Sequence, residues 1–433
     1  MICGSRQRLS FVLVGGCLVA AQFASGGPAS ASIVQPHVVS TNPVDYTPHL
    51  VSDGVDSHPH ADAVVQGGNT LFIGGTFHSV TNSGQTQDQV RHNLFSFNAG
   101  TGAIDAFAPN VDGPVWALEV VGSSLYVGGD FKQVNGVTRP ALVKLDASTG
   151  AVDTAFHAPF SGGRVNELDY VDGRLLVGGS AGKKLLALNP ATGHDTGYLN
   201  LNIADQLPNS WGSVSVYSFA VSPAGDRLVA TGNFMTVSGQ DRSRMFMVNL
   251  GPSAGTLADW YYASFKKSCS STNPRRIAYL YGVDFSPYGS YFVVTATGQV
   301  PEFKSQIGEM VCDASARFNT AVTHPDRPVW INYTGGDSVW ATAITGAAVY
   351  VQGHFQWLDN PNGIGSQDGG GASRRRGVGA IDPDTGLALP WNGDKPAQMG
   401  GKDFLATTSG LWVVSDSFLF HGEYHHGIAF CPL

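Results

Sequence analysis

The sequence predicts an all-β protein, a single seven-bladed β-propeller with four antiparallel strands in each blade. Three observations lead to this prediction: a repeat that recurs along the chain, a composition rich in glycine and poor in charge, and a last repeat that lacks its final strand. Glycine occurs 55 times in 433 residues, and charged residues make up 13% of the chain. Ordinary domains contain about 7% glycine and about 25% charged residues, so this composition favours short strands joined by tight turns.

The repeat is an apolar strand that ends in Gly-Gly, a polar residue and Phe. Its clearest copy covers residues 125–131, and the copies follow one another at intervals of 50 to 64 residues. Seven copies at such a period are typical of a propeller that builds one four-stranded sheet from each repeat. The copies begin at Leu71, Leu125, Leu175, Leu228, Phe292, Val349 and Leu411.

The second repeat shows the four expected strands, and the turns between them carry the residues that such turns need. Glycine at the first turn, Gly122, supplies the positive φ of a tight hairpin. Acids at the third turn, such as Asp146 and Asp382, cap their own turns and so have a structural role. The strands are expected at residues 115–121, 125–131, 141–146 and 151–156.

The two ends of the chain predict a closed ring. The last repeat stops at a third strand near Ile428, and residues 44–48 resemble a fourth strand such as residues 104–109. We therefore expect the N-terminal segment to complete the seventh blade, which removes the last exposed strand edges. Two stacked propellers or a solenoid are the alternatives.

Residues 1–31 have the features of a secretory signal peptide. Arg6 and Arg8 precede an apolar stretch at residues 9–22, and Ala29-Ser30-Ala31 fits the small-residue cleavage rule. We expect residues 32–433 to form one exported domain, secreted or held at the cell surface. A buried N-terminal helix and a lipid anchor at Cys17 are the alternatives. No later stretch is long enough to span a membrane.

Charge and cysteine content narrow the partners further. The formal net charge is −8 and the basic runs are brief, which argues against nucleic acid as a partner. We expect a monomer. Cys269 and Cys312 belong to two loops of the fifth blade that share one face, so we predict a disulfide between them, which stabilises the fold by about 3–4 kcal/mol. Cys431 is left over.

The repeat also resembles a known family. Residues 125–131, followed by residues 134–139 and by Leu142-Val143-Lys144-Leu145-Asp146 with Thr149-Gly150, resemble the delta-sixty-type repeat of secreted bacterial β-propellers of unknown function. The resemblance covers nearly all of residues 32–433, is sharpest in the first, second and fourth blades, and is poor in the fifth and seventh. It implies a propeller fold and export, and it implies no activity.

Loop lengths indicate which face binds a ligand. Long insertions occur between second and third strands, at residues 76–93, 298–317 and 354–376. We expect the binding face to hold these insertions and the entrances of the first strands. A ring of residues at those entrances would suit a sugar or another flat-faced ligand, unless its aromatic side chains pack between blades as core. The ring consists of Asp62, Trp116, Asn166, Tyr217, Tyr281, Trp340 and Phe404, with Asp403 beside it.

Two classes of function follow from this. The first is a non-enzymatic binding or scaffold protein whose unidentified ligand is a carbohydrate or a surface protein. The alternative is an extracellular polysaccharide hydrolase or lyase that uses Asp62, Glu167 and Asp403 around the channel mouth. A propeller with a redox cofactor is a third class, and no motif supports it.

Motifs of catalytic and metal sites are weak. Residues 178–182 match a nucleophile-elbow pattern, but they join two strands instead of a strand and a helix. His421, Glu423, His425 and His426 lack the spacing of a helical zinc motif. We expect no cofactor, and calcium held by loop oxygens stays open.

Overall fold

The computed structural model describes residues 33–56, 58–298, 300–365, 367–396 and 400–433. The expected signal peptide, with the alternative lipid anchor at Cys17, therefore lies outside the described residues. The regular structure is almost entirely strand, accompanied by two short 3₁₀ helices, η1 (Ala263–Lys266) and η2 (Lys304–Gln306). Across the described ranges, no helix is long and apolar enough to cross a membrane.

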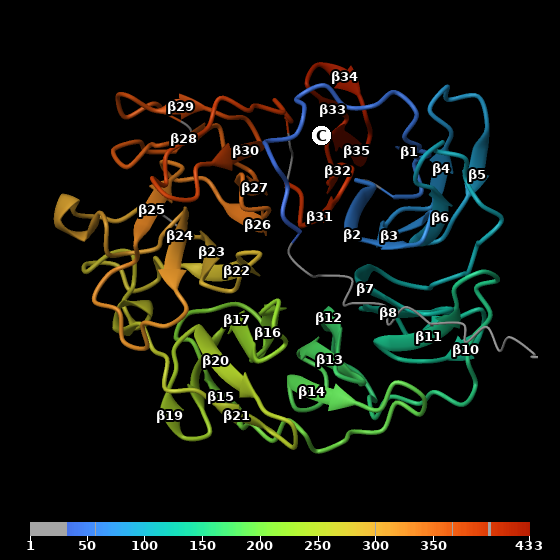
Figure 1. The fold of residues 1–433 in the computed structure, drawn as a ribbon, viewed down its shortest axis with the longest axis horizontal. Coiled ribbons are helices and arrows are strands. Elements are labelled where there is room, and N and C mark those ends of the chain that lie inside the picture. Colours follow the sequence, from blue (N-terminus) through green and yellow to red (C-terminus); the bar gives the residue numbers. More distant parts are fainter. Residues whose placement is uncertain (1–32, 57, 299, 366, 397–399) are drawn as a thin grey trace, which may run out of the picture.

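Seven sheets of the described chain share one antiparallel order, in which the first strand pairs with the second and the second with the third. We call them repeat sheets one to seven, in chain order. They are arranged around a common centre, with the first strands innermost (Figure 1). These first strands are β2 (His60–Gly67), β7 (Val115–Val121), β12 (Val165–Val171), β16 (Val216–Val221), β22 (Tyr279–Phe285), β26 (Val339–Ile344) and β31 (Asp403–Thr407).

The second and third strands lie successively farther from the centre (Figure 1). The second strands are β3 (Thr70–Thr76), β8 (Ser124–Gly129), β13 (Arg174–Gly179), β17 (Arg227–Gly232), β23 (Tyr291–Thr297), β27 (Val349–Gly353) and β32 (Gly410–Val414). The third strands are β6 (Leu94–Asn98), β11 (Leu142–Asp146), β14 (Leu185–Leu188), β20 (Met245–Leu250), β24 (Ala314–Asn319), β30 (Val378–Ile381) and β35 (Ile428–Pro432).

The two glycines of the repeat have different physical roles. A Cβ atom on Gly129 would lie 2.0 Å from the carbonyl oxygen of Pro114, just before the first strand of the same sheet. A Cβ atom on Gly128 would lie 2.5 Å from Cγ1 of Val165, in the next sheet. The second glycine therefore lets two strands of one sheet approach each other, and the first lets neighbouring sheets pack.

Fourth strands are shorter than the sequence predicts. Only β21 (Gly255–Leu257) and β25 (Trp330–Tyr333) are full strands in this position within the described chain. In four other repeat sheets a single bridge takes their place, such as that between Val152 and Leu145 where residues 151–156 were expected to pair. Pro109 and Pro390 follow closely after two of these bridges. Proline has no N–H to donate, which helps to explain why the ladder stops there.

Neighbouring repeat sheets contact each other through their first strands. Each first strand lies beside the next, from β2 to β31, and β2 also contacts β31. The N-terminal segment lies along the outer side of repeat sheet seven. The backbone N–H of Val44 donates to the carbonyl oxygen of Phe430 at 3.0 Å, and that of Ser40 donates to Pro432 at 2.7 Å.

The apolar core is divided into clusters between adjacent sheets. One cluster joins Ala63 and Phe72 of repeat sheet one to Val115 and Val127 of repeat sheet two. Because both faces of a sheet are buried in this way, most second strands are largely apolar, while some third strands contain a polar residue such as Lys144 or Arg317.

Small outer sheets fill most of the connections between second and third strands. These sheets combine β1 (His49–Val51) with β4 (Ser79–Thr81) and β5 (Asp88–Val90), β9 (Gln133–Val134) with β10 (Val137–Thr138), and β15 (Ile203–Gln206) with β18 (Phe234–Val237) and β19 (Gln240–Asp241). Two more combine β28 (Trp357–Leu358) with β29 (Ser373–Arg374) and β33 (Leu419–Phe420) with β34 (Glu423–Tyr424).

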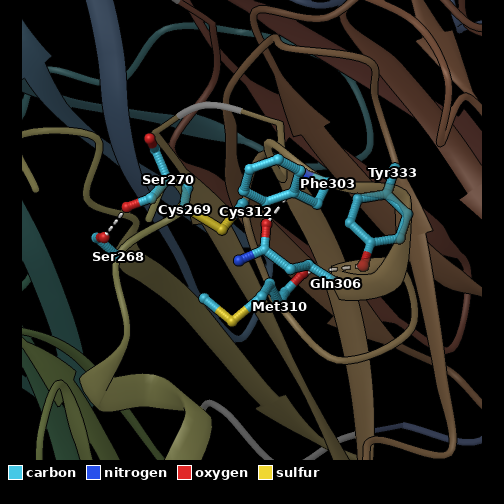
Figure 2. The surroundings of a disulfide bond; sticks show 8 residues. All are labelled: Ser268, Cys269, Ser270, Phe303, Gln306, Met310, Cys312 and Tyr333. Carbon is cyan, nitrogen blue, oxygen red and sulfur yellow. Dashed lines mark hydrogen bonds between the residues drawn. A yellow bond between two sulfur atoms is a disulfide. The ribbon is translucent and has the colours of Figure 1, made fainter. Parts of the chain in front are cut away.

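The insertion at residues 298–317 is held by a disulfide (Figure 2). Cys269, which precedes β22, is bonded to Cys312, the pair for which the sequence predicts a disulfide. The hydroxyl of Tyr333 donates to the carbonyl oxygen of Met310 at 2.9 Å, which ties β25 to the same insertion. Cys431 is buried in β35 outside any disulfide, and burial raises the pKa of its thiol.

Candidate functional site

The first strands surround a cavity of about 1060 Å³. Each residue of the predicted ring lines this cavity, as does Asp403. The structure therefore brings together side chains that are spread over most of the chain, while their binding of a ligand stays a prediction. They are Asp62, Trp116, Asn166, Tyr217, Tyr281, Trp340, Asp403 and Phe404.

Six ring residues lie in β-bulges of the first strands. In β7, Val115 is opposite Gly129 and Ala117 is opposite Gly128, so Trp116 is the extra residue. A bulge bends its strand and re-aims the extra side chain. The same irregularity includes Asp62 in β2, Asn166 in β12, Tyr217 in β16, Tyr281 in β22 and Trp340 in β26. β31 pairs with β32 without such a shift.

Aromatic rings gather on one side of the cavity, along repeat sheets four to six. The rings of Tyr217 and Tyr281 stack with centroids 4.8 Å apart and planes 7° apart. The ring of Trp340 meets that of Tyr281 edge-on at 4.6 Å. Tyr279 adds a fourth ring, 6.2 Å from Tyr281. We call Tyr217, Tyr279, Tyr281 and Trp340 the aromatic side.

Two residues near these rings were missed by the sequence analysis. Tyr279 lines the cavity two positions before Tyr281, and Trp211 lies in the loop before β16 with 85% of its surface exposed. The backbone N–H of Trp211 donates to the hydroxyl of Tyr279 at 3.1 Å. Tyr279 lies on the same strand as Tyr281, so the run Tyr-Leu-Tyr could have indicated a second ring in the cavity. No pattern in the sequence indicated Trp211.

Carboxylates gather on the opposite part of the wall, along repeat sheets seven, one and three. Asp62 is buried and lies 3.2 Å from both Nζ of Lys402 and Nε2 of His60. Burial alone would raise the pKa of Asp62, but Lys402 and His60 outweigh it and hold that pKa below its ordinary value. Asp62 is therefore an anion fixed between two basic groups.

Asp403 and Glu167 are held by hydrogen bonds from neighbouring sheets. Asp403 accepts from the backbone N–H of Val64 at 2.9 Å, and Glu167 accepts from the hydroxyl of Ser218 at 2.9 Å. Burial raises the pKa of Asp403 to about 7. Burial, and then the charge of Asp403, raise the pKa of Glu167 to about 8.

Asp169 completes this set. Its side chain is 4% exposed, and burial raises its pKa to about 7. Within the described part of the chain, its Oδ1 atom has no hydrogen-bond partner. We call Asp62, Glu167, Asp169 and Asp403 the acidic side.

Trp116 lies on the acidic side of the ring and has a cation for a neighbour. The guanidinium of Arg164 lies 5.3 Å from the centre of the Trp116 ring. The same guanidinium is 3.1 Å from a carboxylate oxygen of Asp130. Arg164 therefore covers an aromatic face that the sequence analysis assigned to a ligand.

The wall as a whole is acidic. Six carboxylates and two cations line the cavity. Both cations already have carboxylate partners, Lys402 with Asp62 and Arg164 with Asp130. The carboxylates are Asp62, Asp130, Glu167, Asp169, Asp284 and Asp403.

Comparisons with known proteins address the fold. A family model described as "Domain of unknown function (DUF5122) beta-propeller" matches residues 124–156, from β8 into the fourth segment of repeat sheet two. The solved structure titled "Structure of U3-55K" is similar over 90% of this chain and 100% of that chain, with a TM-score of 0.51 and 9% identity. The chain has a β-propeller repeat fold. At this identity the likeness extends to fold alone.

A second solved structure shows a similar overlap in length. The structure titled "Crystal structure of RRP9 WD40 repeats" is similar over 90% of this chain and 99% of that chain, with a TM-score of 0.49 and 9% identity. No curated protein matches the sequence. The match at repeat sheet two falls on the copy of the repeat that the sequence analysis found clearest.

The histidines near the C-terminus hold the N-terminal segment. Nδ1 of His426 is 2.7 Å from the carbonyl oxygen of Leu50, and Nδ1 of His425 is 3.0 Å from the hydroxyl of Thr47. In the described chain, no group of three or more His, Cys, Asp or Glu residues is arranged to hold a metal ion. The contacts of His425 and His426 fasten residues 47–50 to the end of repeat sheet seven.

Proposed function

We propose that the chain is an exported binding protein, a closed seven-bladed β-propeller that holds a carbohydrate in the mouth of its central cavity and catalyses no reaction. Contact between β2 and β31 and the hydrogen bonds from Ser40 and Val44 to β35 support closure of the ring. The signal-like residues 1–31 and the Cys269–Cys312 disulfide support export, because disulfides persist in oxidising compartments.

One observation carries the binding proposal: the aromatic side lines a cavity of about 1060 Å³. Ligand pockets range over about 300–1,000 Å³ and combine apolar walls with a few polar groups. Aromatic rings present flat apolar faces to the C–H face of a sugar. Carboxylates such as Glu167 and Asp403 accept strong hydrogen bonds, and sugar hydroxyls can donate them.

A glycan array with the purified exported protein tests this proposal. We expect binding to at least one class of glycan, and at least a tenfold loss of affinity in Tyr281→Ala. The matched control is Tyr288→Ala, because Tyr288 is 81% exposed and lies outside the cavity lining. Binding to no glycan, or equal losses in both variants, would overturn the proposal. A cell-wall pull-down then decides whether a surface protein is the ligand.

Hydrolysis or elimination on a polysaccharide is the second candidate, and one observation favours it. Glu167 and Asp403 both line the cavity, and the charge of Asp403 helps to raise the pKa of Glu167 to about 8. Carboxyl groups with pKa values near the working pH suit general acid–base catalysis. Release of reducing ends from a bound polysaccharide, abolished by Glu167→Gln, would establish the enzyme. We expect none.

A further inference from the structure

Resting on the proposed carbohydrate binding, we propose that the ligand is an amino sugar, a saccharide with free ammonium groups that bind Glu167, Asp169 and Asp403 while its rings lie on the aromatic side. This proposal concerns the charge of the ligand, which the aromatic rings alone do not define.

The first argument is the charge of the wall. Of six carboxylates lining the cavity, Asp62 and Asp130 are paired with Lys402 and Arg164 at 3.2 and 3.1 Å. Glu167, Asp169 and Asp403 form no ion pair with any residue that the structure describes. Burial, with added repulsion from other carboxylates at Glu167 and Asp403, raises the pKa values of these three groups to about 7 or 8, so a bound cation would favour their ionised forms and displace protons from them.

The second argument is the state of Asp169. Its side chain is 4% exposed and lies in the cavity wall, and its Oδ1 atom has no hydrogen-bond partner in the described chain. A buried carboxylate oxygen that accepts no hydrogen bond is unfavourable. An ammonium group offers three N–H donors and a positive charge, so it supplies what this part of the wall lacks.

The aromatic side is compatible with the same ligand. Cations are attracted to the faces of Trp and Tyr rings within about 6 Å. A neutral sugar would stack equally well but would leave the three carboxyl groups without a cation. An acidic sugar would be repelled by them. The expected order of affinity is therefore amino sugar, neutral sugar, acidic sugar.

A matched pair of ligands tests the role of charge. Titration calorimetry at pH 6.5 compares the hexamer of glucosamine with the hexamer of N-acetylglucosamine, which share a backbone and differ in the charged amine. We expect the glucosamine hexamer to bind at least tenfold more tightly. Equal or tighter binding of the acetylated hexamer overturns this inference but leaves carbohydrate binding intact, whereas binding of no glycan at all overturns both.

Further ligands and variants distinguish binding at this specific site from general electrostatic attraction to an acidic protein. Spermine carries charge without sugar rings, so binding as tight as that of the glucosamine hexamer would overturn the saccharide part of the inference. Glu167→Gln keeps the shape of the side chain, and we expect it to cut the tenfold preference below threefold. Glu423→Gln, in the outer hairpin of β33 and β34, should keep the preference. The ligand pair in the unaltered protein decides the matter even if a variant fails to fold.

Discussion

The side chains on the two sides of the cavity have different kinds of interaction partner. On the aromatic side, Tyr217, Tyr281 and Trp340 contact one another, so each of these rings packs against another. On the acidic side, Asp403 and Glu167 each reach across to a neighbouring sheet, at Val64 and Ser218. Neither hydrogen bond brings a cation, and the pKa values of Asp403 and Glu167 are raised to about 7 and about 8.

This difference shows that the first strands, arranged around one cavity, support two kinds of chemistry. The rings hold one another by mutual contacts, and burial raises the pKa of Tyr281 to about 12, so this ring stays uncharged near neutral pH. The carboxyl groups respond to pH and to a ligand, because a proton or a cation changes their charge. Four predictions test this contrast, beginning with the backbone that both sides share.

Breaking the contact between the first two strands of a sheet should have the largest effect. In Gly179→Ala, the new Cβ would lie 2.0 Å from the carbonyl oxygen of Arg164, which must move. We expect a loss of more than about 3 kcal/mol in the free energy of unfolding, measured by urea denaturation. Gly173→Ala, at the turn of the same hairpin, meets no atom within 4 Å. Its positive φ should cost about 1–2 kcal/mol, and equal losses would refute the argument.

Removing the middle ring should destabilise the aromatic side. Tyr281→Ala eliminates ring contacts at 4.8 and 4.6 Å and leaves a void, so we expect a loss of about 2–4 kcal/mol in urea denaturation. Trp211→Ala removes a larger but exposed ring and should change stability by less than about 0.5 kcal/mol. If the Trp211 variant lost more, the mutual packing of the aromatic side would be disproved.

The acidic side should make the free energy of unfolding depend on pH. The folded chain holds a proton on Glu167 up to a pKa of about 8, against an ordinary value of 4.5, because of burial and then Asp403. The contribution of this group is therefore complete below pH 4.5 and is lost as the pH rises through about 8. Each such proton accounts for about 1.4 kcal/mol per pH unit.

Glu167→Gln removes this group, so its stability should fall less steeply between pH 5 and pH 8 than that of the unaltered chain. Asp169 and Asp403, whose pKa values are raised to about 7, keep part of the slope in both proteins. Urea unfolding at the two pH values gives the comparison, and parallel slopes would mean that Glu167 is ionised throughout.

The smallest effect is expected at Trp116, where the two kinds of chemistry meet. Arg164→Ala removes a cation 5.3 Å from the indole ring and an exposed ion pair with Asp130. We expect a loss below about 1 kcal/mol, together with a change in tryptophan fluorescence as the ring face opens. A larger loss would indicate that Arg164 anchors the loop before β12.

Much of this arrangement could be predicted from the sequence. The Gly-Gly repeat placed every second strand, and counting back from it placed the ring residues at the entrances of the first strands. The β-propeller repeat prediction is confirmed by the structure and the family model. The pairing of Cys269 with Cys312 followed from the expected position of two loops, and the structure contains it.

The rest depended on contacts between distant residues. Arg164, which precedes β12, lies over the ring of Trp116 in the preceding sheet, and nothing near either residue in the chain indicates this. The sequence analysis named Asp62, Glu167 and Asp403 of the acidic side but missed Asp169, which follows Glu167 by two positions on the same strand. Fourth strands were predicted too long because the turn residues that signal where they start do not show where their pairing ends, which at two of the bridges is shortly before a proline.

The bulges have a consequence for how such a cavity can change. An extra residue has no strict counterpart across the ladder, so its side chain can be exchanged without altering which residues pair around it. Asp, Trp, Asn and Tyr already occupy this one position in different sheets. The lining of the cavity can therefore vary residue by residue while the surrounding strands keep their register.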